Sequence, residues 1–276
     1  MSASVIALIS DLGTQDNYVG VMKGVMLGIA ADARLVDISH AIQPGDIREA
    51  AFMLTLSFEY FPSGTVFCGV IDPGVGSERR AVAVRIYYHD RSYTFVGPDN
   101  GLVTGVLAVS GIEVDTVVSL ENGQFHLPVV SSTFHGRDIF APASAHLARG
   151  EQIEALGPVL APTLLTRLAW PSPDQEAGDW HADIIYADRF GNLVTNMRAS
   201  EFRASRAPHI PVDEWRVWLG DIELGPLRRT FADVAPRMPL AYIGSTGFVE
   251  IAIRDGSARE SLRYQPDTRV VLRLKD

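Results

Sequence analysis

The sequence has only one cysteine, Cys68, and this scarcity excludes a small secreted fold held together by disulfides. It also lacks positive charge, because 24 Lys and Arg residues face 33 Asp and Glu residues and leave a formal net charge of −9. Proteins that bind nucleic acids neutralise phosphates with basic side chains, so we expect no nucleic-acid partner. Small molecules are the partners that this composition favours.

Long apolar runs are missing as well. None approaches the roughly 18 residues of a membrane-spanning helix, and residues 1–4 contain no basic leader segment. We therefore expect a cytoplasmic protein with no membrane partner. Four signature motifs are also absent, namely GxGxxG after the first strand, GxxxxGK[ST], HExxH and GxSxG. Their absence argues against Rossmann-type dinucleotide binding, P-loop nucleotide hydrolysis, zinc proteolysis and α/β-hydrolase esterolysis.

Residues 1–157 alternate short apolar runs with segments of helical periodicity. Strands are predicted at residues 5–9, 35–38, 65–71, 81–88 and 92–96, and helices at residues 18–30, 46–60 and 134–147. The run 65–71 is nearly all apolar, as expected for a strand that is buried on both faces. The alternation predicts an α/β domain over residues 1–157, with a Rossmann-like layered sheet covered by helices.

The composition changes after residue 157. Residues 158–179 contain four prolines and no periodicity, which is typical of a linker. Beyond them, strands are predicted at residues 181–186, 193–196, 215–219, 240–243, 248–253 and 269–274. The close turns between these strands predict a smaller all-β domain over residues 180–276, either an antiparallel sandwich or a barrel.

Four clusters of polar residues follow apolar strands of the first domain. They are Ser10-Asp11-Leu12-Gly13-Thr14, Asp72-Pro73-Gly74-Val75-Gly76-Ser77-Glu78-Arg79, Gly97-Pro98-Asp99-Asn100-Gly101 and Thr133-Phe134-His135-Gly136-Arg137-Asp138. Ligands of open α/β sheets bind outside the carboxyl ends of the strands, so the four clusters together predict a site. Any single Asp at a strand end is more often a turn or N-cap residue.

These clusters resemble the motifs of the S-adenosylmethionine hydrolase family, also called S-adenosylmethionine hydroxide adenosyltransferases, which is related to the fluorinases and chlorinases. Two later segments continue the match in the family's order, Asp188-Arg189-Phe190-Gly191-Asn192 and Gly244-Ser245-Thr246-Gly247-Phe248-Val249-Glu250-Ile251-Ala252. The resemblance spans nearly the whole chain. It implies an α/β N-terminal domain, a β-barrel C-terminal domain, and a homotrimer that holds its substrate at subunit interfaces.

The reaction that the resemblance implies is attack of water or hydroxide on C5′ of S-adenosylmethionine, which yields adenosine and methionine. Three residues match the family's catalytic positions. Asp72 would accept a hydrogen bond from the water, Arg79 would stabilise the ionised carboxylate, and His135 would bind the same water or take its proton. The sulfonium leaves as a neutral thioether, so no general acid is needed. The resemblance implies neither a cofactor nor a metal.

The resemblance also implies a set of substrate-binding residues. They are Asp11, Asp188, Asn192, Phe231, Ser245, Glu250 and Ile253. Asp11 matches the ligand of the two ribose hydroxyls, and Phe231 is expected to stack on adenine. The contact at the adenine edge stays open, because Arg254 stands where the family commonly has Asn. Each role has a structural alternative: an N-cap for Asp11, a turn acid for Asp188 and core packing for Phe231.

Related halogenases carry Tyr-Ser where this chain has His135-Gly136, and a phenol where it has Asp72. An ionised Asp72 would repel a halide, so halogenation is disfavoured. Two other functions remain open. One is a metal-dependent phosphohydrolase with oxygen and nitrogen ligands from Asp11, Asp72, Asp99, Asn100 and His135. The other is a non-catalytic protein that binds adenosine or S-adenosylmethionine.

Overall fold

The computed structural model describes residues 4–205, 211–264 and 268–275. The chain divides into two compact units, Met1–Trp170 and Pro171–Asp276. The first unit is a mixed α/β structure and the second is built on sheets of strands. The predicted two-domain architecture and the α/β character of its N-terminal part are therefore confirmed. Within the described ranges, no helix is both long and apolar enough to cross a membrane.

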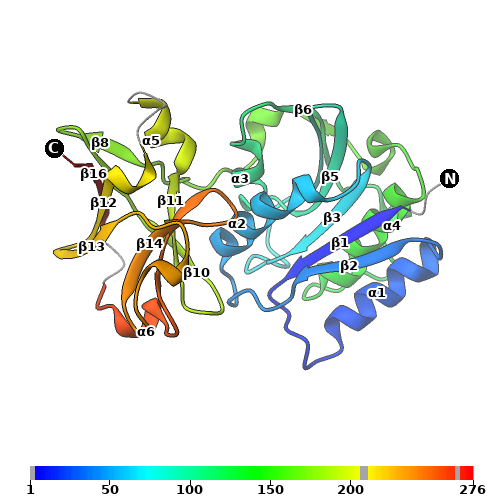
Figure 1. Cartoon of the computed structure of the whole chain (residues 1–276). Helices are drawn as coiled ribbons and strands as arrows, with labels where there is room; N and C mark the ends of the chain where they lie inside the picture. The colour runs from blue at the N-terminus through cyan, green and yellow to red at the C-terminus, as the bar shows by residue number, and fades with distance from the viewer. Residues whose placement is uncertain (1–3, 206–210, 265–267, 276) are drawn as a thin grey trace. The chain divides into compact units, whose positions relative to one another are not determined.

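The first unit is organised around one seven-stranded sheet (Figure 1). Its strands are β1 (Val5–Ser10), β2 (Arg34–Ser39), β3 (Thr65–Val70), β4 (Ala81–Tyr88), β5 (Arg91–Pro98), β6 (Ile112–Ser119) and β7 (Val159–Leu160), in the order β2-β1-β3-β5-β4-β6-β7. Strand β1 runs parallel to β2 and β3, and β3 runs parallel to β5. Every residue of β3 is buried, as its apolar sequence predicts. The carboxyl ends of β1 and β3 therefore lie side by side at one edge of the sheet.

Helices cover both faces of this sheet, and the alternation of side chains along β1 shows how (Figure 1). Ile6 and Leu8 belong to the core with α1 (Tyr18–Ile29) and α4 (Ala141–Ala148). Ala7 and Ile9 belong to the opposite core with α2 (Ile47–Ser57) and α3 (Thr104–Leu107). Short helical turns complete the unit: η1 (Phe58–Tyr60), η2 (Gly123–Phe125), η3 (Gly136–Phe140), η4 (Ile153–Leu156) and η5 (Pro162–Leu164).

The helix predicted at residues 134–147 begins later and differently. It starts with η3, a π-helical turn, and continues as α4. Such turns are rare and concentrate at functional sites. The strands predicted at 81–88 and 92–96 are present and pair in antiparallel fashion, as expected.

The segment 158–179 is not entirely without regular structure. Strand β7 pairs with β6 in the first unit, and β8 (Asp174–Glu176) pairs with β9 (Asp179–Ala182) in the second. Strands of two or three residues are too short to show a periodicity in the sequence. The domain limits 1–157 and 180–276, with a linker between them, stay a prediction.

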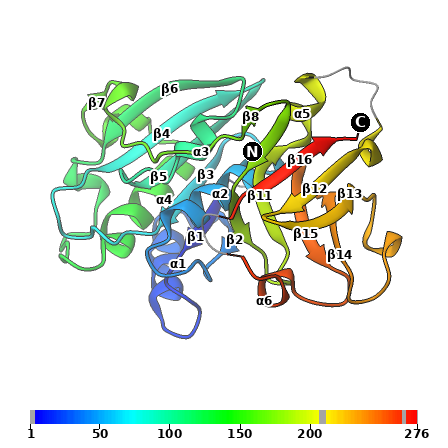
Figure 2. The same cartoon turned by 90° about the vertical axis from the view of Figure 1, so that its left-hand side faces the viewer.

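The second unit carries two antiparallel sheets (Figure 2). Its further strands are β10 (Ile184–Ala187), β11 (Leu193–Arg198), β12 (Trp215–Leu219), β13 (Ile222–Pro226), β14 (Pro239–Ile243), β15 (Phe248–Ile253) and β16 (Val270–Leu274). The sheets have the orders β10-β11-β15-β14 and β13-β12-β16-β9-β8. Short helices α5 (Ala199–Ser205), η6 (Val212–Glu214), η7 (Phe231–Asp233) and α6 (Ala258–Ser261) connect them. Alternate residues of β12, namely Trp215, Val217 and Leu219, enter the core.

Candidate active site

A cavity of about 390 Å³ lies at the sheet edge where β1 and β3 end. It is lined by Asp11, Leu12, Pro44, Gly45, Val70, Asp72, Pro73, Val75, Thr133, Phe134, His135 and Gly136. Three residues that the sequence predicts as functional, Asp11, Asp72 and His135, therefore face one space. Asp11 follows β1, Asp72 follows β3, and His135 immediately precedes η3.

Arg79 contacts both Asp72 and His135, although it is not among the residues that line the cavity. Its Nε donates a hydrogen bond to Asp72 Oδ1 at 2.9 Å, and its Nη2 donates to Asp72 Oδ2 at 2.5 Å. The same Nη2 lies 2.7 Å from His135 Nδ1. The guanidinium also stacks over the buried ring of Phe140, 5.3 Å from its centroid. The side chains of Arg79 and Asp72 are only 11% and 6% exposed, so the pair is shielded from water.

The contact with Arg79 fixes how His135 carries its proton. A guanidinium has only donors, so His135 Nδ1 accepts and the ring proton resides on Nε2. Burial and then the charge of Arg79 lower the pKa of His135 below its ordinary value of 6.5. The imidazole is therefore neutral near pH 7, its Nε2 carries the ring N–H, and the ring has a further hydrogen-bond partner in the Ser131 backbone.

The segment that leads to His135 is held from two sides. The buried carboxylate of Asp138 accepts a hydrogen bond from the Ser131 backbone N–H at 2.8 Å, and Ser131 Oγ accepts one from Phe134 N–H at 3.1 Å. Burial alone would raise the pKa of Asp138, but its bonds to Arg137 and Ser131 bring the pKa below the ordinary value. A Cβ at Gly76 would lie 2.4 Å from Ser132 O, so only glycine allows the loop after β3 to pack here.

Asp11 meets the cavity from the end of β1. Its Oδ2 accepts a hydrogen bond from the Gly45 backbone N–H at 2.8 Å. Gly45 has a φ of +76°, which glycine adopts without strain. The N-cap position of α1 is occupied by Asn17, so the structural alternative of Asp11 as the N-cap is wrong.

Asp188 and Asn192 come together in the turn between β10 and β11. Asp188 Oδ2 accepts from Asn192 Nδ2 at 2.8 Å, and Asp188 Oδ1 accepts from the backbone N–H groups of Phe190 and Asn192 at 2.9 and 2.8 Å. These are the bonds of a turn acid, so the structural alternative for Asp188 describes its contacts. The side chain of Phe190 is 74% exposed, which is unusual for an aromatic residue.

Phe231 and Glu250 are linked by a residue that the sequence did not single out, Tyr242. The Phe231 and Tyr242 rings lie 4.9 Å apart, and Tyr242 Oη donates to Glu250 Oε2 at 2.5 Å. Phe231 is 40% exposed, so it is not a core residue. Burial and then the charge of Asp188 raise the pKa of Glu250, while the Tyr242 hydroxyl opposes this. Tyr242 pairs with Glu250 in the β14–β15 hairpin. The two residues lie at similar distances from the turn between the strands predicted at residues 240–243 and 248–253, and this spacing could have pointed to Tyr242.

The remaining predicted residues also lie in the second unit. Ser245 is exposed at the turn between β14 and β15, whereas Ile253 is buried in the core of the unit. Arg254 Nη1 donates a hydrogen bond to Val234 O at 2.7 Å. The structure thus groups the predicted site residues into two sets, one in each unit.

The five ligands of the alternative metal site do not converge. Asp99 accepts from the side chain of Arg80 and from the Thr166 backbone, and Asn100 bonds to backbone groups. Over residues 4–205, 211–264 and 268–275, no group of three or more His, Cys, Asp or Glu side chains is placed to hold a metal ion. The donor set of a metal-dependent phosphohydrolase is therefore not assembled in the described part of the chain.

Known proteins resemble this chain over most of its length. Residues 6–157 match the SAM hydroxide adenosyltransferase N-terminal domain, and residues 182–271 match the C-terminal domain of the same family. The (R)-S-adenosyl-L-methionine hydrolase of Thermus thermophilus is 39% identical over 93% of this chain and 94% of its own length. A fluorinase from Actinopolyspora mzabensis is 32% identical over 91% of each chain. The crystal structure of an uncharacterized conserved protein from Thermotoga maritima superposes with a TM-score of 0.87, at 32% identity, over 97% of this chain and 99% of the other.

Fold and site together define a two-domain protein whose α/β unit places a carboxylate and an imidazole at one cavity and joins them through a guanidinium. Both domain models match in the expected order and cover most of the sequence. The chain belongs to the S-adenosylmethionine hydroxide adenosyltransferase family.

Proposed function

We propose that the protein hydrolyses S-adenosylmethionine to adenosine and methionine. One observation carries this proposal: Arg79 ties Asp72 to His135 at a cavity that Asp11 also enters. The relatives named (R)-S-adenosyl-L-methionine hydrolase support it, since those of Thermus thermophilus and Salinispora tropica are 39% and 35% identical over nearly the whole chain.

In this proposal Asp72 and His135 orient one water molecule behind C5′ of the substrate. Asp72 keeps a free lone pair on each oxygen despite Arg79, so it can accept a hydrogen bond from the water. His135 donates from Nε2 to the water oxygen, and it does not take the proton because Nδ1 is occupied by Arg79. The O–C5′ bond forms as the C5′–S bond breaks, the electron pair goes to sulfur, and the water proton passes by Asp72 to solvent. Holding the water in line supplies much of the rate.

Substrate binding is proposed for both units. Asp11 would accept hydrogen bonds from the ribose hydroxyls within the cavity, in keeping with its bond from Gly45 that orients the carboxylate. In the second unit, Asp188, Asn192, Phe231, Ser245, Glu250 and the backbone around Ile253 would bind the rest of the substrate. The exposed Phe231 ring supports a stacking role. We propose that this set completes the site of a neighbouring subunit in a homotrimer, and light scattering of the purified protein tests that stoichiometry.

We further propose that the second unit closes into a barrel and that the first has the Rossmann-like layering. Two contacts support closure of the barrel. Strands β9 and β10 follow each other across the single residue Asp183, which joins the two sheets on one side. On the other side, Arg228 after β13 forms a bridge with Tyr242 of β14. The cytoplasmic location remains a prediction of the sequence.

The test is to incubate the purified protein with S-adenosylmethionine in ¹⁸O-labelled water. Adenosine and methionine should form in equal amounts, with the label in the 5′-hydroxyl of adenosine. Asp72→Ala and His135→Ala should each be much slower, and activity should survive EDTA. Calorimetric binding of S-adenosylmethionine without products would instead identify a non-catalytic binding protein.

The same assay separates hydrolysis from halogenation, which matters because fluorinases are among the relatives. The carboxylate of Asp72 lines the cavity and would repel a halide ion. Fluoride or chloride added at high concentration should therefore give no 5′-halogenated product and should leave the rate of adenosine formation unchanged. Formation of a 5′-halogenated nucleoside would contradict the role given to Asp72.

A further inference from the structure

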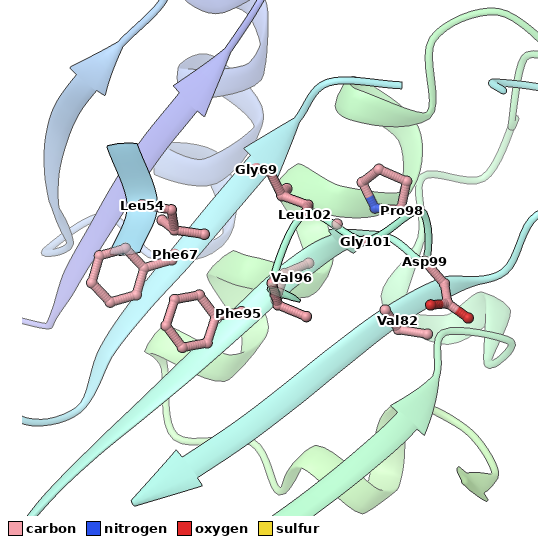
Figure 3. A pocket seen from close by; sticks show the side chains of 12 residues that line it. Leu54, Phe67, Gly69, Val82, Phe95, Val96, Pro98, Asp99, Gly101 and Leu102 are labelled. Carbon is pink, nitrogen blue, oxygen red and sulfur yellow. The ribbon is translucent and has the colours of Figure 1, made fainter. Parts of the chain in front are cut away.

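The turn Gly97-Pro98-Asp99-Asn100-Gly101 has no place in the chemistry described above. It begins with the last two residues of β5 and precedes α3, and none of its residues lines the 390 Å³ cavity. Gly97, Pro98, Asp99 and Gly101 line a small pocket of about 10 Å³. Among the residues that line this pocket, Asp99 lies at the opposite end from Phe67 (Figure 3). The polar side chains of this turn are therefore not explained by packing against that pocket.

Asn100 forms a hydrogen bond to the residue immediately before Asp72. Its Nδ2 donates a hydrogen bond to Ile71 O at 2.8 Å, and its Oδ1 accepts one from the Leu102 backbone N–H at 3.3 Å. The two partners differ in kind, so they fix which way the amide faces. Ile71 is fully buried, and its carbonyl precedes the Asp72 backbone directly. The bond thus sets the direction in which the chain leaves β3.

Asp99 forms an ion pair with Arg80, the residue immediately after Arg79. Its Oδ2 accepts from Arg80 Nε at 2.9 Å and from Arg80 Nη2 at 2.6 Å, while its Oδ1 accepts from the Thr166 backbone N–H at 2.7 Å. The Asp99 backbone N–H also donates to Arg80 O at 2.9 Å. The Asp99 side chain is only 3% exposed, whereas that of Arg80 is 38% exposed, so the pair joins a buried carboxylate to a partly solvated guanidinium.

Between these two anchors the loop also forms backbone hydrogen bonds within its own turns. Val75 N–H donates to Asp72 O and Ser77 N–H donates to Gly74 O, each at 3.1 Å. Such bonds shape the loop but do not orient it relative to the sheet. The turn that carries the anchors is itself pressed against β3, because a Cβ at Gly97 would lie 2.6 Å from Gly69 O. Asn100 and Asp99 therefore fix both ends of the loop between Asp72 and Arg79 relative to the sheet.

We propose that the turn at residues 97–101 is a positioning element for the Asp72–Arg79 pair. Asn100 sets the end of the loop that bears Asp72, and Asp99, through Arg80, sets the end that bears Arg79. This inference rests on the proposed function, because it assumes that the pair orients the attacking water. It assigns Asn100 and Asp99 to the geometry of the reaction and not to substrate binding.

Asn100→Asp tests the first anchor, because it keeps the size of the side chain but places an oxygen against Ile71 O. We expect kcat to fall 10- to 100-fold, since about 1 Å of misplacement costs on the order of 100-fold. KM should stay within about threefold because Asn100 lies outside the cavity. Asp99→Asn should give the same pattern of kcat and KM. This variant keeps the oxygen that accepts from Thr166, and it serves as the test if Asn100→Asp does not fold.

Asn122→Asp is a matched control. Asn122 has the same pair of bonds as Asn100, from Nδ2 to Ala155 O at 2.8 Å and to Oδ1 from Gln124 N–H at 3.1 Å, but it holds a different loop. This variant loses a side-chain hydrogen bond of the same kind and should keep its kcat. An equal loss of kcat in Asn122→Asp, or a kcat within twofold of wild type in both turn variants, would overturn the proposal.

A second readout does not depend on turnover. The Nε–H resonance of Arg79, assigned by its loss in Arg79→Lys, reports the bond to Asp72. It should shift or broaden in Asn100→Asp and in Asp99→Asn but not in Asn122→Asp. If the wild type does not consume S-adenosylmethionine, the proposed function fails while this measurement still decides the positioning role. An unchanged resonance in both turn variants would overturn that role.

Discussion

The first unit brings site residues together from separate elements, as in the Arg79–His135 contact, whereas the second unit pairs residues within one turn or one hairpin, as in Asp188–Asn192 and Tyr242–Glu250. Arg79 reaches His135 across 56 residues, and it also holds Asp72. In the second unit, Asp188 bonds to a residue four positions later, and the partners Tyr242 and Glu250 are eight positions apart.

This difference shows what each set is suited for. Bonds between distant elements fix the angles between groups, which a displacement at one carbon requires. Bonds within a turn fix only its shape and leave faces such as that of Phe231 exposed for contact. We therefore expect substitutions of Asp72, Arg79 and His135 in the first unit to lower kcat, and substitutions in the second set to raise KM.

The largest effect is expected from Asp72→Asn. The amide cannot accept the proton of the water, and its NH₂ group would face the donors of Arg79. We expect kcat to fall by about 10² to 10⁴, the usual range for loss of a positioned acid or base. KM should change by less than about threefold. Adenosine formation measured by liquid chromatography over a range of substrate concentrations gives both constants.

Asp115→Asn is the control for this variant. Asp115 also accepts from an arginine, Arg85, at 2.5 Å in the first unit, but far along the sheet on β6. Its kcat should equal that of the wild type. If Asp72→Asn raised KM and spared kcat, the division of work between the two units would be wrong.

The sequence supports only part of this site. Polar clusters after β1 and β3 predict that Asp11 and Asp72 share an edge of the sheet, because parallel strands bring their carboxyl ends together. The contact of Arg79 with His135 was visible neither in any spacing nor in the roles that the resemblance implied, and it comes from the structure. The difference between Arg79 and Arg80 is likewise tertiary, since one arginine turns to Asp72 and the next to Asp99.

A smaller effect is expected for His135→Gln, whose amide can still donate a hydrogen bond. We expect about a tenfold loss of kcat. In the wild type, burial and Arg79 lower the pKa of His135, so the neutral form prevails above that pKa and activity falls only as the pH drops through it. Glutamine does not titrate there. The fall of kcat on the acid side should therefore disappear from the pH profile of the variant, and its persistence would assign it to another group.

The second set is tested by Phe231→Ala. If this exposed ring stacks on adenine, its loss should cost about 1.4 kcal/mol of binding, which is a tenfold rise in KM. The value of kcat should stay within about threefold. Ile222→Ala removes an apolar side chain of the same unit with the same 40% exposure, and it should leave both constants unchanged. Equal effects of the two variants would show that Phe231 acts through stability alone.

The fold was more visible in the sequence than the site, and for a physical reason. Strand β3 is buried on both faces and helix α1 on one. Burial requires apolar residues at the buried positions, so both elements can be recognised from the spacing of apolar residues in the sequence. Strand β6 was not predicted, although the alternation of Ile112 and Val114 with the exposed acidic residues Glu113 and Asp115 is the pattern of a half-buried strand. Strand β13 was missed as well, since it is short and carries Gly225 and Pro226 at its end.

The smallest effect is expected for Tyr242→Phe, which removes the hydroxyl that bonds to Glu250 and keeps the ring beside Phe231. Burial raises the pKa of Glu250 and the hydroxyl opposes this, so the variant should have a still higher pKa at Glu250. As the pH falls, Glu250 then becomes protonated earlier than in the wild type. If the ionised carboxylate binds substrate, KM should rise as the pH falls, by about twofold, and the rise should begin at a higher pH than in the wild type. Adding Glu250→Gln should abolish this difference in pH dependence, because the amide does not titrate; a difference that survives would mean that Tyr242 contacts the substrate directly.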